Sequence, residues 1–194
     1  MAEPSRQPFI VGIGGSAGKG MATEYVLGQV LDAAAAQGAR TQMFGGAFLA
    51  RLPLYAPGAD MRTPEEAELV EAIRACDGLV IASPGYHGGV SGLVKNALDL
   101  LEELRTDARP YLDGRAVGLV AVAAGWQATG STLMVLRSIV HALRGWPTPF
   151  GAALNSSSAV FDDQGRCSEP RTVEQLGLVA RQVLQFAEAF SARR

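Results

Sequence analysis

Two glycine-rich segments hold the residues best suited to bind a small molecule. The first, GIGGSAGKGMATE (Gly12–Glu24), combines flexible backbone with the hydroxyls of Ser16 and Thr23 and the charge of Lys19. Backbone N–H groups at the start of a helix bind phosphate well. The segment therefore indicates a phosphate site, and an ordinary strand-to-helix turn with polar surface residues is the alternative interpretation.

Three better-known phosphate sites do not fit this sequence. A P-loop would need glycine at position 13 and a hydroxyl at position 20, where Ile13 and Gly20 stand. A dinucleotide-binding domain would need an acidic residue after its second strand, but TQMFGG (Thr41–Gly46) ends in glycine. An aspartate-phosphorylated receiver domain would need an aspartate where Ser83 stands. Kinase, Rossmann and receiver functions are therefore disfavoured.

The second segment, SPGYHGG (Ser83–Gly89), follows the apolar run GLVIA. Its glycines let the backbone approach a flat ligand closely, and the Tyr86 ring can form a wall beside it. His87 is expected to contribute backbone to the rim of a site rather than to act as an acid or base.

The elements that position these segments follow from the apolar pattern. Strands are predicted at Phe9–Gly15, Thr41–Phe44, Gly78–Ser83, Ala116–Ala124 and Trp146–Leu154. Helices are predicted over about 20–37, from Thr63 as N-cap with Pro64 in the first turn, and over about 91–105, 130–143 and 172–190.

Strands without polar alternation, separated by helices, are typical of a parallel sheet covered on both faces. We therefore expect one domain over residues 1–194, a flavodoxin-like, doubly wound α/β fold with five parallel strands in the order 2-1-3-4-5. Ligands bind such sheets beyond the carboxyl ends of the strands, where both glycine-rich segments are predicted to lie.

Composition limits the kinds of partner. The chain has 194 residues, 48% of them hydrophobic, and a formal net charge of −2, which gives no electrostatic footprint for nucleic acid or an anionic membrane. No apolar run is long enough to suggest a membrane span, and no basic start with an apolar core suggests a signal peptide. Cys76 and Cys167 lack metal-site spacing and fit a reducing compartment, so the cytoplasm is the expected location.

The second segment resembles the NADPH-dependent FMN reductase family, which includes flavin-dependent quinone and azo reductases. That family typically reads S-P-x-Y-x-x-x-x-x-G-x-L-K-N-x-x-D here. This chain matches it at Ser83, Pro84, Tyr86, Gly92, Lys95, Asn96 and Asp99, with Val94 in place of leucine.

The first segment matches the family less closely. The usual pattern is G-S-x-R-x-x-S-x-N, in which arginine, serine and asparagine hold the phosphate. Gly15 and Ser16 fit, whereas Gly18, Met21 and Thr23 replace those three residues, and we expect the neighbouring Lys19 to supply the missing charge.

The resemblance implies FMN as cofactor and NADPH or NADH as co-substrate. It also places the segment after the fourth strand, AAGWQATGS, beside the ring, although Trp126 there could instead be a packing residue or an oligomer contact. The implied binding residues are Gly15, Ser16, Lys19, Thr23, Pro84, Gly85, Tyr86, His87, Gly88, Gly125 and Trp126. No residue is assigned a catalytic role or a metal.

The implied function is hydride transfer from NAD(P)H to flavin N5, then to free flavin, a quinone or another small acceptor, with a flavin-dependent monooxygenase as an expected partner. A non-catalytic flavin-binding electron carrier and a relative that has lost flavin are the alternatives. The segment Ser91–Arg105 carries an apolar arc wider than a sheet-facing stripe, which predicts a homodimer or homotetramer. A cover formed by the connection before Pro64 is the alternative for that face.

Overall fold

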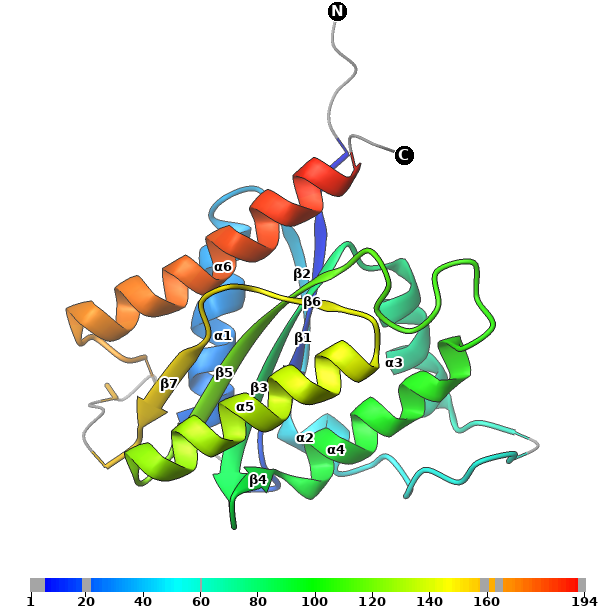
Figure 1. Ribbon diagram of the computed structural model, residues 1–194, viewed down its shortest axis with the longest axis horizontal. Helices are drawn as coiled ribbons and strands as arrows, with labels where there is room; N and C mark the ends of the chain where they lie inside the picture. The colour runs from blue at the N-terminus through cyan, green and yellow to red at the C-terminus, as the bar shows by residue number, and fades with distance from the viewer. Residues whose placement is uncertain (1–5, 19–21, 60, 158–160, 163–165, 192–194) are drawn as a thin grey trace, which may run out of the picture.

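A parallel sheet forms the centre of the molecule (Figure 1). The computed structural model describes residues 6–18, 22–59, 61–157, 161–162 and 166–191. The principal strands are β1 (Phe9–Gly14), β2 (Arg40–Phe44), β3 (Gly78–Tyr86), β5 (Ala116–Ala123), β6 (Trp146–Pro147) and β7 (Ala152–Asn155). Their order is β2-β1-β3-β5-β6, with β7 also paired to β5. When β6 and β7 are counted as one strand and the short β4 is left aside, the five strands numbered in chain order are arranged 2-1-3-4-5. This confirms the flavodoxin-like topology predicted from the sequence.

The fifth predicted strand is divided in two. β6 pairs with Ala116 and Val117 of β5, and β7 pairs with residues 120–123. Between them, residues 148–151 lie opposite only residues 118–119 of β5. Pro149 has no N–H to offer a sheet, so the extra chain leaves the ladder there and rejoins it at Ala152.

Helices cover both faces of the sheet (Figure 1). One face packs against α1 (Ala22–Ala35) and α6 (Pro170–Ser191). The other packs against α3 (Pro64–Ala75), α4 (Gly92–Asp99), the 3₁₀ helix η1 (Leu100–Leu104) and α5 (Trp126–Ala142), with the short α2 (Gly46–Leu49) at its edge. Successive strand residues face opposite sides, so Ile10 and Val80 join the first apolar cluster while Val11 and Leu79 join the second.

The sequence predicted the start of α3 correctly and placed the start of α5 too late. The N-cap predicted at Thr63 is confirmed, since its hydroxyl accepts the Glu66 N–H at 3.2 Å and the Glu66 carboxylate accepts the Thr63 N–H at 2.7 Å. Pro64 is the first helical residue. By contrast, α5 begins at Trp126 rather than near Gly130, so Gly130 lies within the helix.

The apolar arc expected to be exposed on the segment 91–105 is buried within the chain, so that expectation was wrong. Leu98, Leu101 and Leu104 are all at most 2% exposed. The connection before α3 lies against this segment: the side chain of Asn96 accepts the Tyr55 N–H at 2.8 Å and donates to the Pro53 carbonyl at 2.8 Å. The intrachain alternative is therefore correct for these residues, and the oligomeric state stays a prediction.

The described part of the chain has neither a helix that could span a membrane nor a cluster of metal-binding side chains. None of the helices there combines the length and apolar character that crossing a membrane requires. Within the same residues, no three His, Cys, Asp or Glu side chains are grouped closely enough to hold a metal ion.

Candidate functional site

The candidate site lies at the carboxyl edge of the sheet. The arrowheads of β3 and β7 point to the lower edge in Figure 1, where the short strand β4 (Gly89–Val90) and the first turn of α5 also lie. Parallel strands bring the segments that follow β1, β3 and β5 to this edge. The residues predicted to bind the cofactor belong to these segments, to the helices that they enter or, for Pro84, Gly85 and Tyr86, to the last residues of β3.

The segment after β1 is held in place by glycines. Gly15 has φ +123°, and a Cβ on it would lie 2.6 Å from the Gly46 nitrogen. A Cβ on Gly46 would in turn lie 1.9 Å from the Ser16 carbonyl oxygen. Only glycine permits this approach, so the turn after β2 supports the segment that carries Ser16.

The hydroxyl of Ser16 is the strongest sign of a ligand in this segment. The residue is 6% exposed, and its Oγ is buried without a hydrogen-bond partner in the described chain. Buried hydroxyls are normally paired, so this one points to a partner that is not part of the protein. Thr23, in the first turn of α1, is buried nearby in sequence, whereas Lys19 lies outside the described residues.

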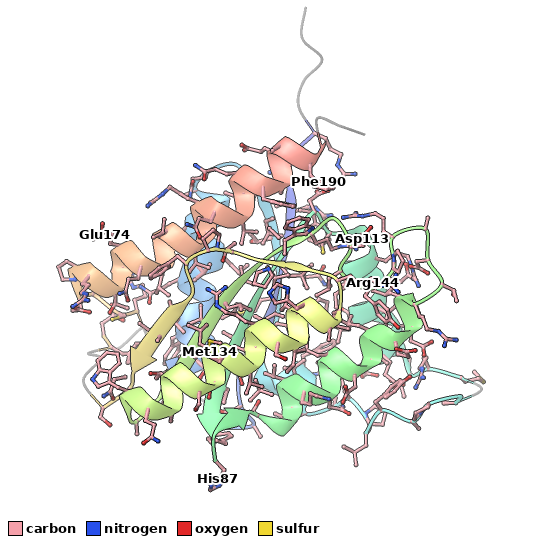
Figure 2. The ribbon with its side chains drawn as sticks, viewed as in Figure 1. His87, Asp113, Met134, Arg144, Glu174 and Phe190 are labelled. Carbon is pink, nitrogen blue, oxygen red and sulfur yellow. The ribbon has the colours of Figure 1, made fainter. Side chains whose placement is uncertain are left out.

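The segment after β3 is a tight hairpin, which the sequence analysis did not identify. Gly85 pairs with Val90 and Tyr86 with Gly89 in antiparallel register. The two residues between them, His87 and Gly88, have φ +49° and +88°. Positive φ at both central positions is the type I′ geometry that suits a two-residue hairpin. Figure 2 shows the His87 side chain projecting from the tip, and it is exposed.

A serine pair joins this hairpin to α4. The Ser83 hydroxyl accepts the Ser91 N–H at 3.0 Å and donates to the Pro84 carbonyl at 2.9 Å. Ser91 is the N-cap of α4, because its own hydroxyl accepts the Val94 N–H at 3.3 Å. The serine that opens the family motif therefore closes the base of the hairpin rather than contacting a ligand.

The first cleft joins the segment after β1 to the hairpin. It has a volume of about 500 Å³ and is lined by Ser16, Ala17, Gly18, Tyr86, Ser91, Gly92 and Leu93. That volume is within the usual range of small-molecule sites, roughly 300–1,000 Å³. Tyr86 is 47% exposed and lines the cleft.

The second cleft lies between the hairpin and α5. It measures about 420 Å³ and is lined by Gly88, Gly125, Gln127, Ala128 and Ser131. The Thr132 hydroxyl donates to the Gly89 carbonyl at 3.3 Å and ties the helix to the hairpin. Gly125 caps α5 without a side-chain hydrogen bond, so the N–H groups of the first turn remain available at this cleft.

Of the residues predicted to bind the cofactor, four line the two clefts. Ser16 and Tyr86 share the first cleft, and Gly88 and Gly125 share the second. Trp126 lines neither of them: it is 65% exposed and borders a separate cavity.

Several lining residues were not predicted. Ser91 and Leu93 follow the hairpin, and Gln127 and Ser131 lie in the first turns of α5. A usable signal existed only for Ser91, because a serine just before a helical apolar pattern indicates an N-cap. Lys95 and Asp99 form an i,i+4 ion pair with Nζ and Oδ1 2.6 Å apart, which braces α4.

Fold and site together define a doubly wound flavodoxin-like protein with its clefts at the switch point between β1 and β3. The family model described as NADPH-dependent FMN reductase matches residues 8–159, so the chain belongs to that family. This confirms the family that the sequence resembles.

Individual relatives agree with this assignment. The FMN-dependent NADPH-azoreductase of Staphylococcus aureus is 32% identical over 109 residues, which is 56% of this chain and 54% of that protein. The chain thus spans about half the length of the curated relatives it matches.

Solved structures show the same fold. The flavoenzyme NAD(P)H:(acceptor) oxidoreductase of Paracoccus denitrificans has a TM-score of 0.75 at 18% identity, covering 94% of this chain and 98% of that one. An apo NADH:FMN oxidoreductase has a TM-score of 0.69 at 21% identity, with 94% and 90% covered. A flavodoxin, WrbA-like protein of Agrobacterium tumefaciens has a TM-score of 0.60 at 17% identity, with 94% and 99% covered.

The residues present fit FMN. The unpartnered Ser16 hydroxyl can donate to a phosphate, and the first cleft leads from it to the Tyr86 ring. The glycines of the hairpin leave no side chains to obstruct a flat ring: a Cβ on Gly88 or Gly89 would meet only open space.

Proposed function

We propose that the protein is an NAD(P)H-dependent FMN reductase-type oxidoreductase that delivers electrons to free flavin, a quinone or another small acceptor. The single observation that carries the proposal is the first cleft, which is lined both by Ser16, whose buried hydroxyl has no partner in the described chain, and by the half-exposed Tyr86. A phosphate donor at one end and an aromatic wall at the other are the two features that a flavin mononucleotide requires.

The protein's part in the reaction is binding and orientation. Bound FMN would supply the redox chemistry by accepting a hydride and passing electrons on. Ser16 and Thr23 would hold the phosphate end, Tyr86 and the glycine hairpin would hold the ring, and Lys19 would add a positive charge to the phosphate segment. The first turn of α5 presents N–H groups and the positive end of the helix, which favour negative charge on the ring.

No side chain needs to act as an acid or base. Among the described residues, the two clefts are lined by Ser, Ala, Gly, Leu, Gln and Tyr. Tyr86 is the only one of these lining residues with a titratable side chain. Such a site suits a reaction in which the cofactor carries the chemistry and the protein selects which molecules reach it.

Small acceptors are favoured because the clefts are open. Tyr86 is 47% exposed and the hairpin tip at His87 and Gly88 is also exposed, so a second molecule can reach the ring. If the acceptor is free flavin, the reduced product can supply a flavin-dependent monooxygenase. The similarity to an azoreductase makes azo compounds a further acceptor class to test.

An absorbance spectrum of the purified protein with and without added FMN, followed by NADPH and NADH oxidation assays, tests the proposal. We expect FMN fluorescence to be quenched on binding, and NAD(P)H to be oxidised when flavin or quinone is present. Absence of quenching at tens of micromolar FMN, a binding free energy weaker than roughly 6 kcal/mol, would refute the cofactor assignment. Quenching without NAD(P)H oxidation would instead favour the electron-carrier alternative.

A further inference from the structure

A third cavity lies at the first turn of α5 and shares no lining residue with the two clefts. It has a volume of about 400 Å³ and lies where the first turn of α5, the end of β7 and the first turn of α6 meet. Figure 1 shows these three ends converging at the left of the molecule. Its wall includes Trp126, Asn155, Arg171 and Gln175.

The side chains on this wall are suited to a phosphorylated aromatic ligand. Trp126 is 65% exposed, which leaves an indole face free for stacking. In the described chain, Arg171 takes part in no ion pair and no side-chain hydrogen bond. A guanidinium is the preferred protein group for phosphate because its fork matches two phosphate oxygens.

The acidic residue in the same wall is already engaged. The Glu169 carboxylate accepts the Thr172 N–H at 3.2 Å and also binds the Thr172 hydroxyl. It therefore caps α6 and is held against the helix end. Arg171 is the remaining charged group on the wall.

Consecutive residues at the start of α5 line the second cleft and this cavity. Gly125 and Gln127 line that cleft, and Trp126, between them, lines this cavity. A molecule that lies across the first turn of α5 can therefore reach both spaces. A nicotinamide dinucleotide has this form, with a ring that must meet the flavin and an adenosine phosphate end that must rest elsewhere.

We propose that this cavity binds the adenosine phosphate end of the nicotinamide dinucleotide, with Trp126 stacked on the base and Arg171 paired with phosphate. The inference rests on the function proposed above and adds to it a place and a set of residues for the hydride donor. Arg171 is then a specificity-determining residue, because NADPH carries one phosphate more than NADH beside the adenosine.

Tryptophan fluorescence tests binding without any turnover. In a Trp146→Phe background, Trp126 is the sole tryptophan, since the chain has two. We expect adenosine 2′,5′-bisphosphate to quench its emission saturably. Arg171→Gln should weaken this binding about tenfold, the usual loss for a charge-assisted hydrogen bond, and Arg171→Lys should restore part of it. Arg181→Gln, on the same helix but outside the cavity wall, should leave binding unchanged.

Kinetics then separates this inference from the proposed function. We expect Arg171→Gln to raise the KM for NADPH more than the KM for NADH, and adenosine 2′,5′-bisphosphate to compete with NADPH. If NADPH is oxidised but the bisphosphate neither quenches nor competes, the cavity assignment is wrong and the proposed function stands. Quenching with non-competitive inhibition would also overturn it, because the cavity would then bind a free nucleotide. Quenching without any NADPH oxidation would leave a nucleotide site in a protein whose proposed function is wrong.

Discussion

At the scale of single residues, Ser16 is the clearest link between sequence and function. Burying a hydroxyl without a partner costs roughly 1–3 kcal/mol, and folding alone gives no return for that cost. The residue is nevertheless held rigidly, because Gly15 and Gly46 allow the backbone on which it sits to pack against the turn after β2. Such an arrangement is expected where a ligand supplies the missing partner.

Ser16→Ala should therefore have opposite effects on the free and the bound protein. We expect the free energy of unfolding without FMN to stay equal or rise by up to about 1 kcal/mol, since an unpaired buried polar atom is removed. FMN affinity should fall about tenfold, and riboflavin affinity should not change, because only FMN carries the phosphate. Urea unfolding and fluorescence titrations with both ligands measure these effects. Equal weakening of FMN and riboflavin would contradict a phosphate role for Ser16.

Cys76 leads to a prediction about alkaline stability. Burial raises the pKa of this thiol from its ordinary value of 9.0 to about 11, and the nearby guanidiniums of Arg115 and Arg109 reduce the rise. The pKa of Cys76 is higher in the folded protein than in the unfolded chain. The contribution of the neutral thiol to the free energy of unfolding is therefore complete below pH 9 and is lost as the pH rises towards about 11. The loss amounts to at most about 2–3 kcal/mol.

The measurement is the free energy of unfolding between pH 8 and pH 11, compared with Cys76→Ala. The wild-type protein should lose stability more steeply than the variant, and its Cys76 thiol should react with a thiol reagent only on unfolding. Parallel pH profiles for the two proteins would show that the thiol does not titrate as described. The comparison removes the contribution of other groups that titrate in the same range.

At the scale of elements, the β3–β4 hairpin determines how the site is shaped. His87 occupies a left-handed conformation with φ +49°, which asparagine and glycine tolerate better than most residues and β-branched residues tolerate worst. The conformation places Tyr86 against the first cleft and Gly88 against the second. The hairpin therefore connects the two clefts, and strain at its tip should affect both.

Substitutions at His87 test this role. We expect His87→Asn to be neutral or stabilising by a few tenths of a kcal/mol, and His87→Val to be destabilising by roughly 1 kcal/mol. His87→Val should also weaken FMN binding, whereas His87→Asn should not, because the imidazole is exposed and the backbone carries the function. Denaturant unfolding and FMN titration of both variants provide the measurements. Equal behaviour of the two variants would show that the backbone conformation at the tip is unimportant.

The elements also show how much the sequence could predict. Long apolar runs such as Gly78–Ala82 specified the strands and their parallel arrangement, since only a parallel sheet buries them on both faces. The strand order followed from the doubly wound fold class. The hairpin was missed because His-Gly is a weaker turn signal than Asn-Gly. The start of α5 was placed too late because Gly130 suggested a helix boundary, yet it is accommodated inside the helix.

Predicting the site required less than predicting the packing around it. Motif positions brought Ser16, Tyr86 and Gly125 to the correct edge, because strand ends alone determine that placement. The structure places Trp126 in the wall of a separate cavity, since the direction of a side chain in the first turn of a helix depends on where that helix begins. No local pattern could show this.

At the scale of the whole molecule, the connection between α2 and α3 determines which apolar surface is free to contact another copy of the chain. Its backbone is hydrogen-bonded to both the oxygen and the nitrogen of the Asn96 side-chain amide in α4. Its Arg62 also lies against η1, with Nη2 2.7 Å from the Glu103 carboxylate. The apolar residues of α4 are therefore satisfied within one chain. The connection itself presents Leu54 and Met61 to solvent, each 86% exposed.

These two side chains are where we now expect copies of the chain to meet. The prediction of a homodimer or homotetramer is retained, with the connection rather than α4 supplying the apolar contact. Light scattering at micromolar concentration should give a mass of two or four times 20.3 kDa.

Leu54→Ser combined with Met61→Ser should shift that mass toward the monomer, because each removes an exposed apolar side chain from the contact. Val173→Ser, which changes a 46% exposed side chain on α6, should leave the mass unchanged. A wild-type mass near 20.3 kDa would contradict the oligomer. An oligomer that survives the double substitution would instead move the contact away from the connection.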